Sequence, residues 1–236
     1  MRQVITDIER VHECLPDLFG RPFAFDFETT GLSYRKDRPV GIAMTFPNPE
    51  GKIISVDKQG RELLESYYFV IRHTVEMWDG SVVLQEFINE KRLTDAIRGL
   101  FAQRDQIMVA HNAKFDLHFM QKLGVLVEGQ LFDTMLAAQL IDENRENGLK
   151  ALAPLVGVTD MATFDKYVCY EGYGKKEILG APLMQVANYA MLDMRRARPR
   201  TPACWRRSRA RCRSARTRRA SSAWSSPTSR VMRTSS

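Results

Sequence analysis

The chain has 236 residues and a formal net charge of +7, with 35 Lys and Arg against 28 Asp and Glu. Such an excess is typical of nucleic-acid binders, but here it is unevenly distributed. Residues 194–236 contain 14 Arg and no Lys, Asp or Glu, which leaves 21 basic and 28 acidic residues in 1–193. A general positive field therefore cannot explain binding of a phosphodiester by the first part, which would need a metal or a local patch.

The segment 194–236 is dominated by Arg, Ser, Thr, Ala and Pro and has no aliphatic periodicity. We expect it to be a disordered tail rather than a packed domain. One interpretation is an Arg-rich arm that binds nucleic acid, since each Arg can neutralise a phosphate. Another is out-of-frame translation, because the composition changes abruptly, as when a GC-rich gene is read in a wrong frame. The coding DNA, read in its other two frames, would distinguish them.

Residues 1–193 are long enough for one domain with a sizeable core. The four cysteines are scattered and form no Cys-x-x-Cys pair, so neither a zinc site nor a disulfide framework is indicated. No apolar run approaches the roughly 20 residues of a membrane span. We expect an intracellular protein with no membrane contact, and the sequence does not reveal its oligomeric state.

Strands and helices alternate along this domain. Helical spacing of apolar residues predicts helices over 4–18, 84–101, 113–123, 133–141, 149–156 and 183–193. Apolar runs bounded by turn residues predict strands over 22–28, 40–46, 53–56, 67–72 and 107–110. The early strands follow one another as hairpins would, which predicts an antiparallel half-sheet before an α/β alternation. The stretch 158–180 receives no assignment.

Two acids stand at the end of the first expected strand. Asp26 and Glu28 project from the same face, while Phe25 and Phe27 face the other way. Adjacent carboxylates repel each other and lose hydration, a cost that a divalent cation offsets by neutralising both. A metal site is one interpretation, and a solvated strand end with two surface acids is the alternative.

Two later positions could join this pair. Asp116 follows a junction at which a strand runs into a helix, so its helical turn can point at the strand ends. Tyr189 and Asp193 are four residues apart and project from one face of the last helix. Taken alone, Asp116 fits a first-turn acid favoured by the helix dipole, and the Tyr/Asp pair fits ordinary helix surface.

In this order the motifs resemble those of a known family. The three exonuclease motifs of the DEDD superfamily, in its tyrosine branch, resemble Asp26-x-Glu28-Thr29-Thr30-Gly31-Leu32, His111-Asn112-x-Lys114-Phe115-Asp116 and Tyr189-x-x-x-Asp193. Within that branch, the proofreading domain of bacterial and phage family A DNA polymerases is similar in segments 67–73, 132–137 and 148–153. The resemblance covers residues 1–193.

The resemblance implies an α/β fold, a ribonuclease H-like mixed β-sheet flanked by helices, and a site for two Mg²⁺ ions that Mn²⁺ can replace. It assigns the metal ions to Asp26, Glu28, Asp116 and Asp193. It also implies that Tyr189 hydrogen-bonds the attacking water, and that Thr29, Leu32 and Asn112 contact the terminal nucleotides of the substrate. For Leu32 and Asn112 a turn or core role is an equal alternative.

The function so implied is a metal-dependent 3′-5′ exonuclease of the proofreading type that acts on single-stranded DNA 3′ ends. The expected location is the cytoplasm of a bacterial or phage-infected cell. A polymerase domain is absent from the chain, so a DNA polymerase is a candidate partner. Two alternatives stay open: an RNA 3′ exonuclease of the ribonuclease D type, and an inactive truncated fragment that only binds nucleic acid. Pro199 limits the last helix, so Asp193 is expected near a frayed end.

Overall fold

The computed structural model describes residues 2–47, 64–152, 155 and 178–197, without the side chains of 192–197. The chain divides into two units, Met1–Arg198 and Pro199–Ser236. The second unit lies outside the described residues, as do the expected strand 53–56 and most of the unassigned stretch. Within the described part, no helix is long and apolar enough to cross a membrane.

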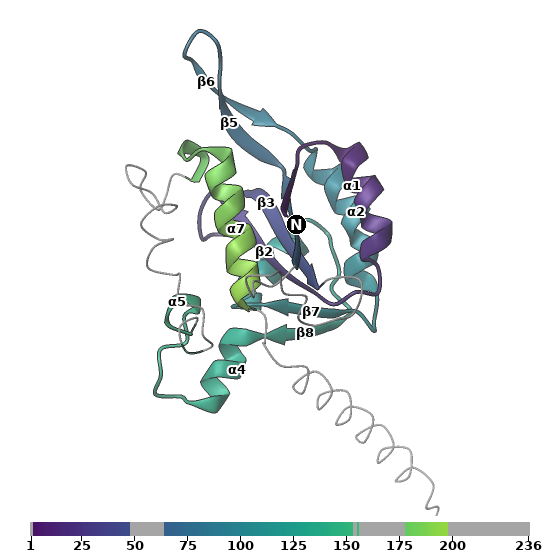
Figure 1. Cartoon of the computed structure of the whole chain (residues 1–236), viewed down its shortest axis with the longest axis vertical. Helices are drawn as coiled ribbons and strands as arrows, with labels where there is room; N and C mark the ends of the chain where they lie inside the picture. Colours follow the sequence, from purple (N-terminus) through teal and green to yellow (C-terminus); the bar gives the residue numbers. More distant parts are fainter. Residues whose placement is uncertain (1, 48–63, 153–154, 156–177, 198–236) are drawn as a thin grey trace, which may run out of the picture. The chain divides into compact units, whose positions relative to one another are not determined.

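A six-stranded sheet with the order β1-β4-β3-β2-β7-β8 forms the centre of the first unit (Figure 1). β2 and β4 each pair with β3 in antiparallel fashion, whereas β1–β4, β2–β7 and β7–β8 are parallel pairs. The sheet is therefore mixed, and the expected antiparallel half-sheet is confirmed. The strands are β1 (Arg2–Ile5), β2 (Phe23–Thr29), β3 (Pro39–Pro47), β4 (Leu64–Val70), β7 (Ile107–Ala110) and β8 (Gln130–Asp133).

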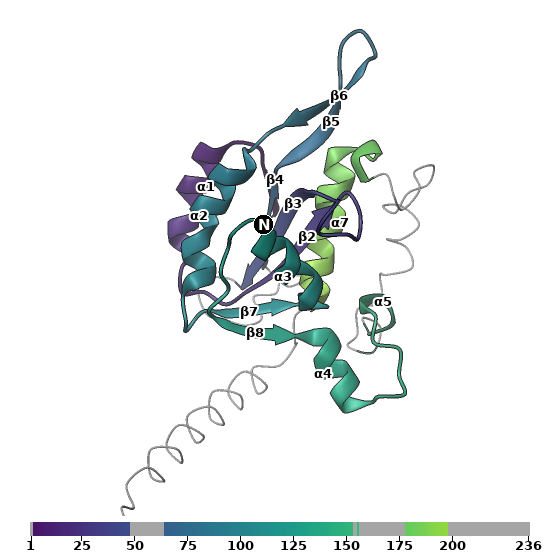
Figure 2. The same ribbon diagram turned by 180° about the vertical axis from the view of Figure 1, so that it is seen from behind.

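Helices cover the sheet, and a hairpin of β5 (Arg72–Glu76) and β6 (Val82–Glu86) extends from it in both views (Figures 1 and 2). At the hairpin turn, Trp78 is 96% exposed. The helical segments are α1 (Ile8–Cys14), η1 (Leu15–Leu18), α2 (Glu90–Ala102), α3 (Ala113–Lys122), α4 (Thr134–Ile141), α5 (Leu149–Leu152), η3 (Ile178–Gly180) and α7 (Leu183–Ala197).

The alternation along β2 separates the hydrophobic core from the chemistry. Phe23, Phe25 and Phe27 belong to a buried cluster shared with α1, α2 and α3. On the other face of the sheet, α7 packs across β2, β3 and β4. There Asp26 pairs with Ala43 of β3, and Glu28 with Gly41. The acids therefore share a face with small residues of β3.

Gly41 is required at its position by a close approach. A Cβ atom there would lie 2.6 Å from the ring of Tyr68 and 2.8 Å from the carbonyl oxygen of Phe69. Both distances are far below van der Waals contact. Gly41 therefore leaves the space in which the buried Tyr68 ring lies across β3, next to the strand that carries Glu28.

Two expected helices begin later than predicted. The segment 4–18 starts as strand β1 and becomes helical only at Ile8, because the Oδ1 atom of Asp7 accepts the Arg10 N–H at 2.7 Å and caps α1. The segment 84–101 starts as strand β6, and α2 begins at Glu90 after Asn89 accepts the N–H groups of Lys91 and Arg92. A polar capping residue decided both boundaries.

Candidate active site

Asp26 and Glu28 project from β2 near its end, beside the helix α7. The side chain of Glu28 is buried, with 8% exposed, and that of Asp26 is half-buried. The pairing with β3 shifts between Glu28 and Thr29, which marks a bulge at the end of the strand. Bulges bend a strand and redirect its side chains, so β2 turns away just past its two acids.

Asp116 reaches this pair through a backbone hydrogen bond. β7 pairs with β2 at Phe23 and Ala24, and this pairing does not extend as far as Phe27. The N–H of Phe27 instead donates to Oδ1 of Asp116 at 3.0 Å. Because Phe27 lies between Asp26 and Glu28 in the sequence, this bond ties Asp116 to the backbone of the strand segment that carries the other two acids. This hydrogen bond supports the predicted convergence of Asp26, Glu28 and Asp116.

The Asp116 carboxyl is almost fully enclosed, with 1% exposed. Burial raises its pKa from 3.8 to about 7, against the opposing effect of the hydrogen bond from Phe27. Its Oδ2 atom is buried and has no hydrogen-bond partner within the described part of the chain. A buried carboxylate oxygen without a donor fits a site for a hard cation, which prefers such ligands.

Asp133 holds the helix that carries Asp116, and sequence reasoning did not assign it a role in the site. Its Oδ1 atom accepts the N–H of Met135 at 2.8 Å, as the N-cap of α4. The same carboxylate accepts the N–H groups of Asn112 at 3.1 Å and Ala113 at 2.9 Å, at the start of α3. One side chain therefore joins the N-termini of two helices. The acid before the helix at 134 was a visible signal for the α4 cap, but the contact with α3 depends on the fold.

Asn112 lies at the N-terminus of α3 in the left-handed region, with φ 62° and ψ 49°. Asn tolerates this conformation better than most residues. Its side chain is exposed and makes no capping hydrogen bond with the residues that the structure describes. Since Asp133 takes over the capping, the amide of Asn112 is available to a substrate.

His111 connects the same two helices. Its Nδ1 atom lies 2.8 Å from the Thr134 hydroxyl, which in turn donates to the carbonyl of Ala110 at 3.3 Å. Burial lowers the pKa of His111, which favours the neutral imidazole. A neutral ring with a proton on Nδ1 satisfies the Thr134 oxygen.

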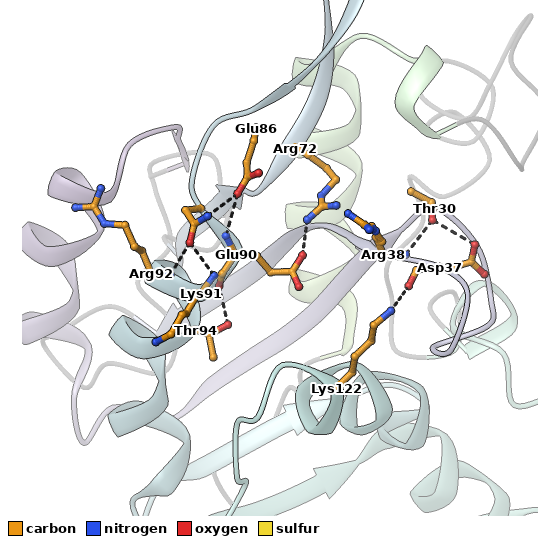
Figure 3. A network of polar contacts seen from close by, with 11 residues as sticks. Thr30, Asp37, Arg38, Arg72, Glu86, Glu90, Lys91, Arg92, Thr94 and Lys122 are labelled. Atoms are coloured by element: carbon orange, nitrogen blue, oxygen red, sulfur yellow. Dashed lines mark hydrogen bonds and ion pairs between the residues drawn. The ribbon is translucent and has the colours of Figure 1, made fainter.

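The loop 30–38 after β2 carries Leu32, one of the expected nucleotide contacts, and is held by Asp37. The Asp37 carboxylate accepts the Thr30 hydroxyl at 3.2 Å and the Ser33 N–H at 2.8 Å. Gly31 leaves room for it, because a Cβ there would lie 2.6 Å from Asp37 Oδ2. Figure 3 shows Lys122 of α3 reaching the carbonyl of Asp37, at 2.7 Å.

Thr29 and Leu32 differ in how accessible they are. The hydroxyl of Thr29 donates to the carbonyl of Gly31 at 2.7 Å, so it stabilises the turn after β2. Leu32 projects from the loop with 88% of its surface exposed. An exposed leucine on a rigid loop fits the expected apolar contact with a base better than the alternative core role.

The last helix carries the other two expected residues. Ala187, Ala190 and Met191 of α7 are buried, which fits the packing of this helix on β2 and β3. Tyr189 is half-buried on the same helix. The backbone of Asp193 belongs to α7, but its side chain lies outside the described residues. Among the described side chains, no group of three His, Cys, Asp or Glu is arranged to hold a metal ion.

A mixed six-stranded sheet flanked by helices, with Asp26 and Glu28 near the end of a central strand, is a ribonuclease H-like fold. The fold is similar to that of Trypanosoma brucei RNase D bound to GMP, with TM-score 0.56 and 14% identity over 83% of this chain and 54% of that chain. A complex of the same RNase D with RNA U12 gives TM-score 0.55 and 15% identity, over 83% of this chain and 59% of the other.

The chain belongs to the 3′-5′ exonuclease family of family A DNA polymerases, whose model matches residues 3–195. It is 37% identical to DNA polymerase I of Chloroflexus aurantiacus over 195 residues, which are 80% of this chain and 18% of that protein. It is also 28% identical to the DNA polymerase of Escherichia phage T5 over 171 residues, or 68% of this chain and 16% of the polymerase. The chain thus spans less than a fifth of the length of these relatives, and it is an enzyme of the exonuclease class.

Proposed function

We propose that this chain removes nucleotides from the 3′ ends of single-stranded DNA by metal-dependent hydrolysis, the proofreading type of exonuclease activity. The observation that carries the proposal is the buried carboxylate of Asp116, which accepts a hydrogen bond from the N–H of Phe27, the residue between Asp26 and Glu28 in β2. Families of this class are generally dependent on divalent metal, and the donor set here consists of carboxylate oxygens. Clustered acids in a protein that binds a polyanion are otherwise unfavourable.

In the proposed mechanism, Asp26, Glu28, Asp116 and Asp193 hold two Mg²⁺ ions, for which Mn²⁺ can substitute. When bound, such a pair supplies an activated water and stabilises the leaving 3′ oxygen. The residues of the chain do the positioning. Phe27 fixes the orientation of the Asp116 carboxylate through its N–H, and the Tyr189 hydroxyl orients the attacking water.

The 3′-terminal nucleotides bind along the loop 30–38 after β2 and along the start of α3. Leu32 contacts a base through its exposed side chain, whereas Thr29 and Asn112 provide polar contacts to sugar and phosphate. The relatives are named DNA polymerases, and this chain covers 18% of the Chloroflexus protein. We therefore propose that a DNA polymerase is the partner of this chain, and that the chain acts in the cytoplasm of a bacterial or phage-infected cell.

The test is degradation of a 5′-labelled single-stranded DNA by the 236-residue chain, with Mg²⁺ and with EDTA. We expect a metal-dependent ladder that shortens from the 3′ end. Asp26→Asn and Asp116→Asn should lower the rate at least about 100-fold, because metal-dependent catalysis needs placement within about an ångström. Tyr189→Phe should reduce the rate by a smaller factor.

The matched control is Asp105→Asn, since Asp105 is an exposed acid on the loop before β7 and should not affect the rate. Equal activity in all variants would contradict the site assignment. Shortening of an RNA of the same sequence while the DNA stays intact would instead support the ribonuclease D-type alternative. Binding without cleavage by a folded preparation would support the inactive-fragment alternative.

A further inference from the structure

A stack of three side chains lies between the loop 30–38 and α3. The rings of Tyr34 and His118 are stacked, with centroids 4.6 Å apart and planes at 27°. The guanidinium carbon of Arg35 lies 5.6 Å from the centroid of Tyr34, and its Nε donates to the Tyr34 hydroxyl at 3.2 Å. We call Arg35, Tyr34 and His118 the aromatic platform.

The platform lines a hollow in the surface. This hollow, of about 410 Å³, is bordered by the platform together with Gln121 and Lys122. Aromatic and guanidinium planes combined with amide and ammonium donors are the groups that bind bases and phosphates of single strands. The platform is also rigid, because Asp37 holds its loop and Lys122 ties that loop to α3.

The two elements that carry the platform also carry acids of the active site. Tyr34 is six residues after Glu28, on the loop that leaves β2, and His118 is two residues after Asp116 on α3. With 3.6 residues per turn, His118 points away from Asp116, so the platform lies on the outer side of α3. It is therefore an extension of the site rather than part of the metal centre.

A second groove joins the platform to the start of α3. This groove, of about 640 Å³, runs between α3 and the segment β8–α4, and its lining includes Ala113 and Asp133 at one end. It shares His118 and Gln121 with the first hollow. The surface is thus hollowed from the helix end that carries Asn112 as far as Tyr34.

The charge around the platform is positive in an acidic domain. Arg35 and Lys36 on the loop and Lys114 on α3 are exposed and belong to none of the ion pairs within the described part. Asp37 is the acid of the loop, and its carboxylate is engaged by Thr30 and Ser33. The local patch that residues 1–193 need for binding a phosphodiester is therefore present here.

We propose that the aromatic platform is a subsite for single-stranded DNA upstream of the 3′-terminal nucleotide. A base stacks on the His118 end of the platform, which the Tyr34 ring supports from the other side, and the Arg35 guanidinium contacts an adjoining phosphate. This subsite rests on the proposed exonuclease function, because it serves the strand whose 3′ end lies at the acids. It makes binding depend on substrate length.

The test compares kcat and KM of the 236-residue chain on a 5′-labelled trinucleotide and on a 12-nucleotide single-stranded DNA. Tyr34→Ala and His118→Ala should raise KM for the longer DNA about five- to 150-fold, the range for loss of a stacked base, and leave kcat unchanged. On the trinucleotide both variants should match the wild type. Tyr34→Phe retains the ring and should retain the wild-type KM.

Trp78→Ala serves as the control, because it removes an exposed aromatic side chain from the distant hairpin. An unchanged KM of Tyr34→Ala on the longer DNA would overturn the subsite, as would an equal rise with Trp78→Ala. A parallel change in kcat on both substrates would also overturn it. Such a change would indicate that Tyr34 and His118 only hold the loop 30–38 against α3.

Binding measurements keep this proposal separate from the exonuclease itself. If the wild type cleaves neither DNA, the proposed function fails, and the subsite is then judged by fluorescence anisotropy of the labelled 12-nucleotide DNA in EDTA. Arg35→Gln should lower the slope of log Kd against log salt concentration by about 0.7, the value for one phosphate of a single strand. Arg104→Gln, at an exposed arginine elsewhere, should leave that slope unchanged. Equal slopes in both variants would overturn the phosphate contact.

Discussion

The contribution of Asp116 to the stability of the metal-free protein should fall as the pH rises from about 4 to about 7. Burial raises the pKa of this carboxyl from 3.8 to about 7. A group with a raised pKa in the folded state contributes stability below its unfolded pKa and loses it as the pH rises through the folded pKa. A shift of about three units corresponds to roughly 4 kcal/mol of unfolding free energy at 1.36 kcal/mol per unit.

Urea-induced unfolding in EDTA, followed by far-ultraviolet circular dichroism between pH 4.5 and 8, measures this loss. Asp116→Asn has nearly the same size and cannot ionise, so the stability difference between wild type and variant should change by about 3 kcal/mol across this range, since part of the loss already precedes pH 4.5. Saturating Mg²⁺ should oppose the loss in the wild type, because it binds the ionised carboxylate. Asp105→Asn, at an exposed acid, should follow the wild type. Parallel curves for wild type and Asp116→Asn would refute the reasoning.

Two further predictions concern residues that support the site. Asp133→Ala should lower the free energy of unfolding by at least about 1–2 kcal/mol, measured in urea, since it removes the cap of α4 together with two acceptors for α3. It should also lower kcat on the trinucleotide; a destabilised variant with unchanged kcat would show that Asp133 does not position Asp116. Gly41→Ala should destabilise the domain by about 1–3 kcal/mol through overlap with the Tyr68 ring. The control Gly99→Ala lies within α2, where a Cβ meets nothing closer than 3.4 Å, and should stabilise by about 0.5–1 kcal/mol. Equal effects at the two glycines would contradict the packing argument.

The sequence predicted the centre of the sheet well, because strong period-two alternation and long apolar runs decide it. The strand with Asp26 and Glu28, its antiparallel neighbour β3 and the helix with Asp116 formed where expected, and the strand expected over 67–72 formed slightly earlier as β4, Leu64–Val70. Predictions failed where a short strand preceded a helix. Ile5 of β1 and Ile8 of α1 are both buried, and their spacing of three residues also fits one helical face, so periodicity could not distinguish strand from helix there. Asp7 and Asn89 were the local signals that could have placed these boundaries.

For the site, the sequence supplied the acids but not what holds them. The bond from Phe27 to Asp116 spans 89 residues, and it exists because β7 ends early beside β2. The double capping by Asp133 likewise depends on β8 lying next to β7, a pairing of four residues too short to recognise from pattern. Long-range contacts of this kind follow from topology rather than from local propensity.

The alternation of Phe25, Asp26, Phe27 and Glu28 also bears on how the sheet assembles. A slip of β2 by one residue would turn every side chain to the opposite face. Two carboxylates would then enter the aromatic cluster, and the phenyl rings would lie under α7, where β3 offers only small residues. An unpaired charge in such surroundings costs several kcal/mol. The acids of the site therefore also exclude misregistered sheets during folding, so neutralising both should lower the fidelity of strand pairing as well as the rate of hydrolysis.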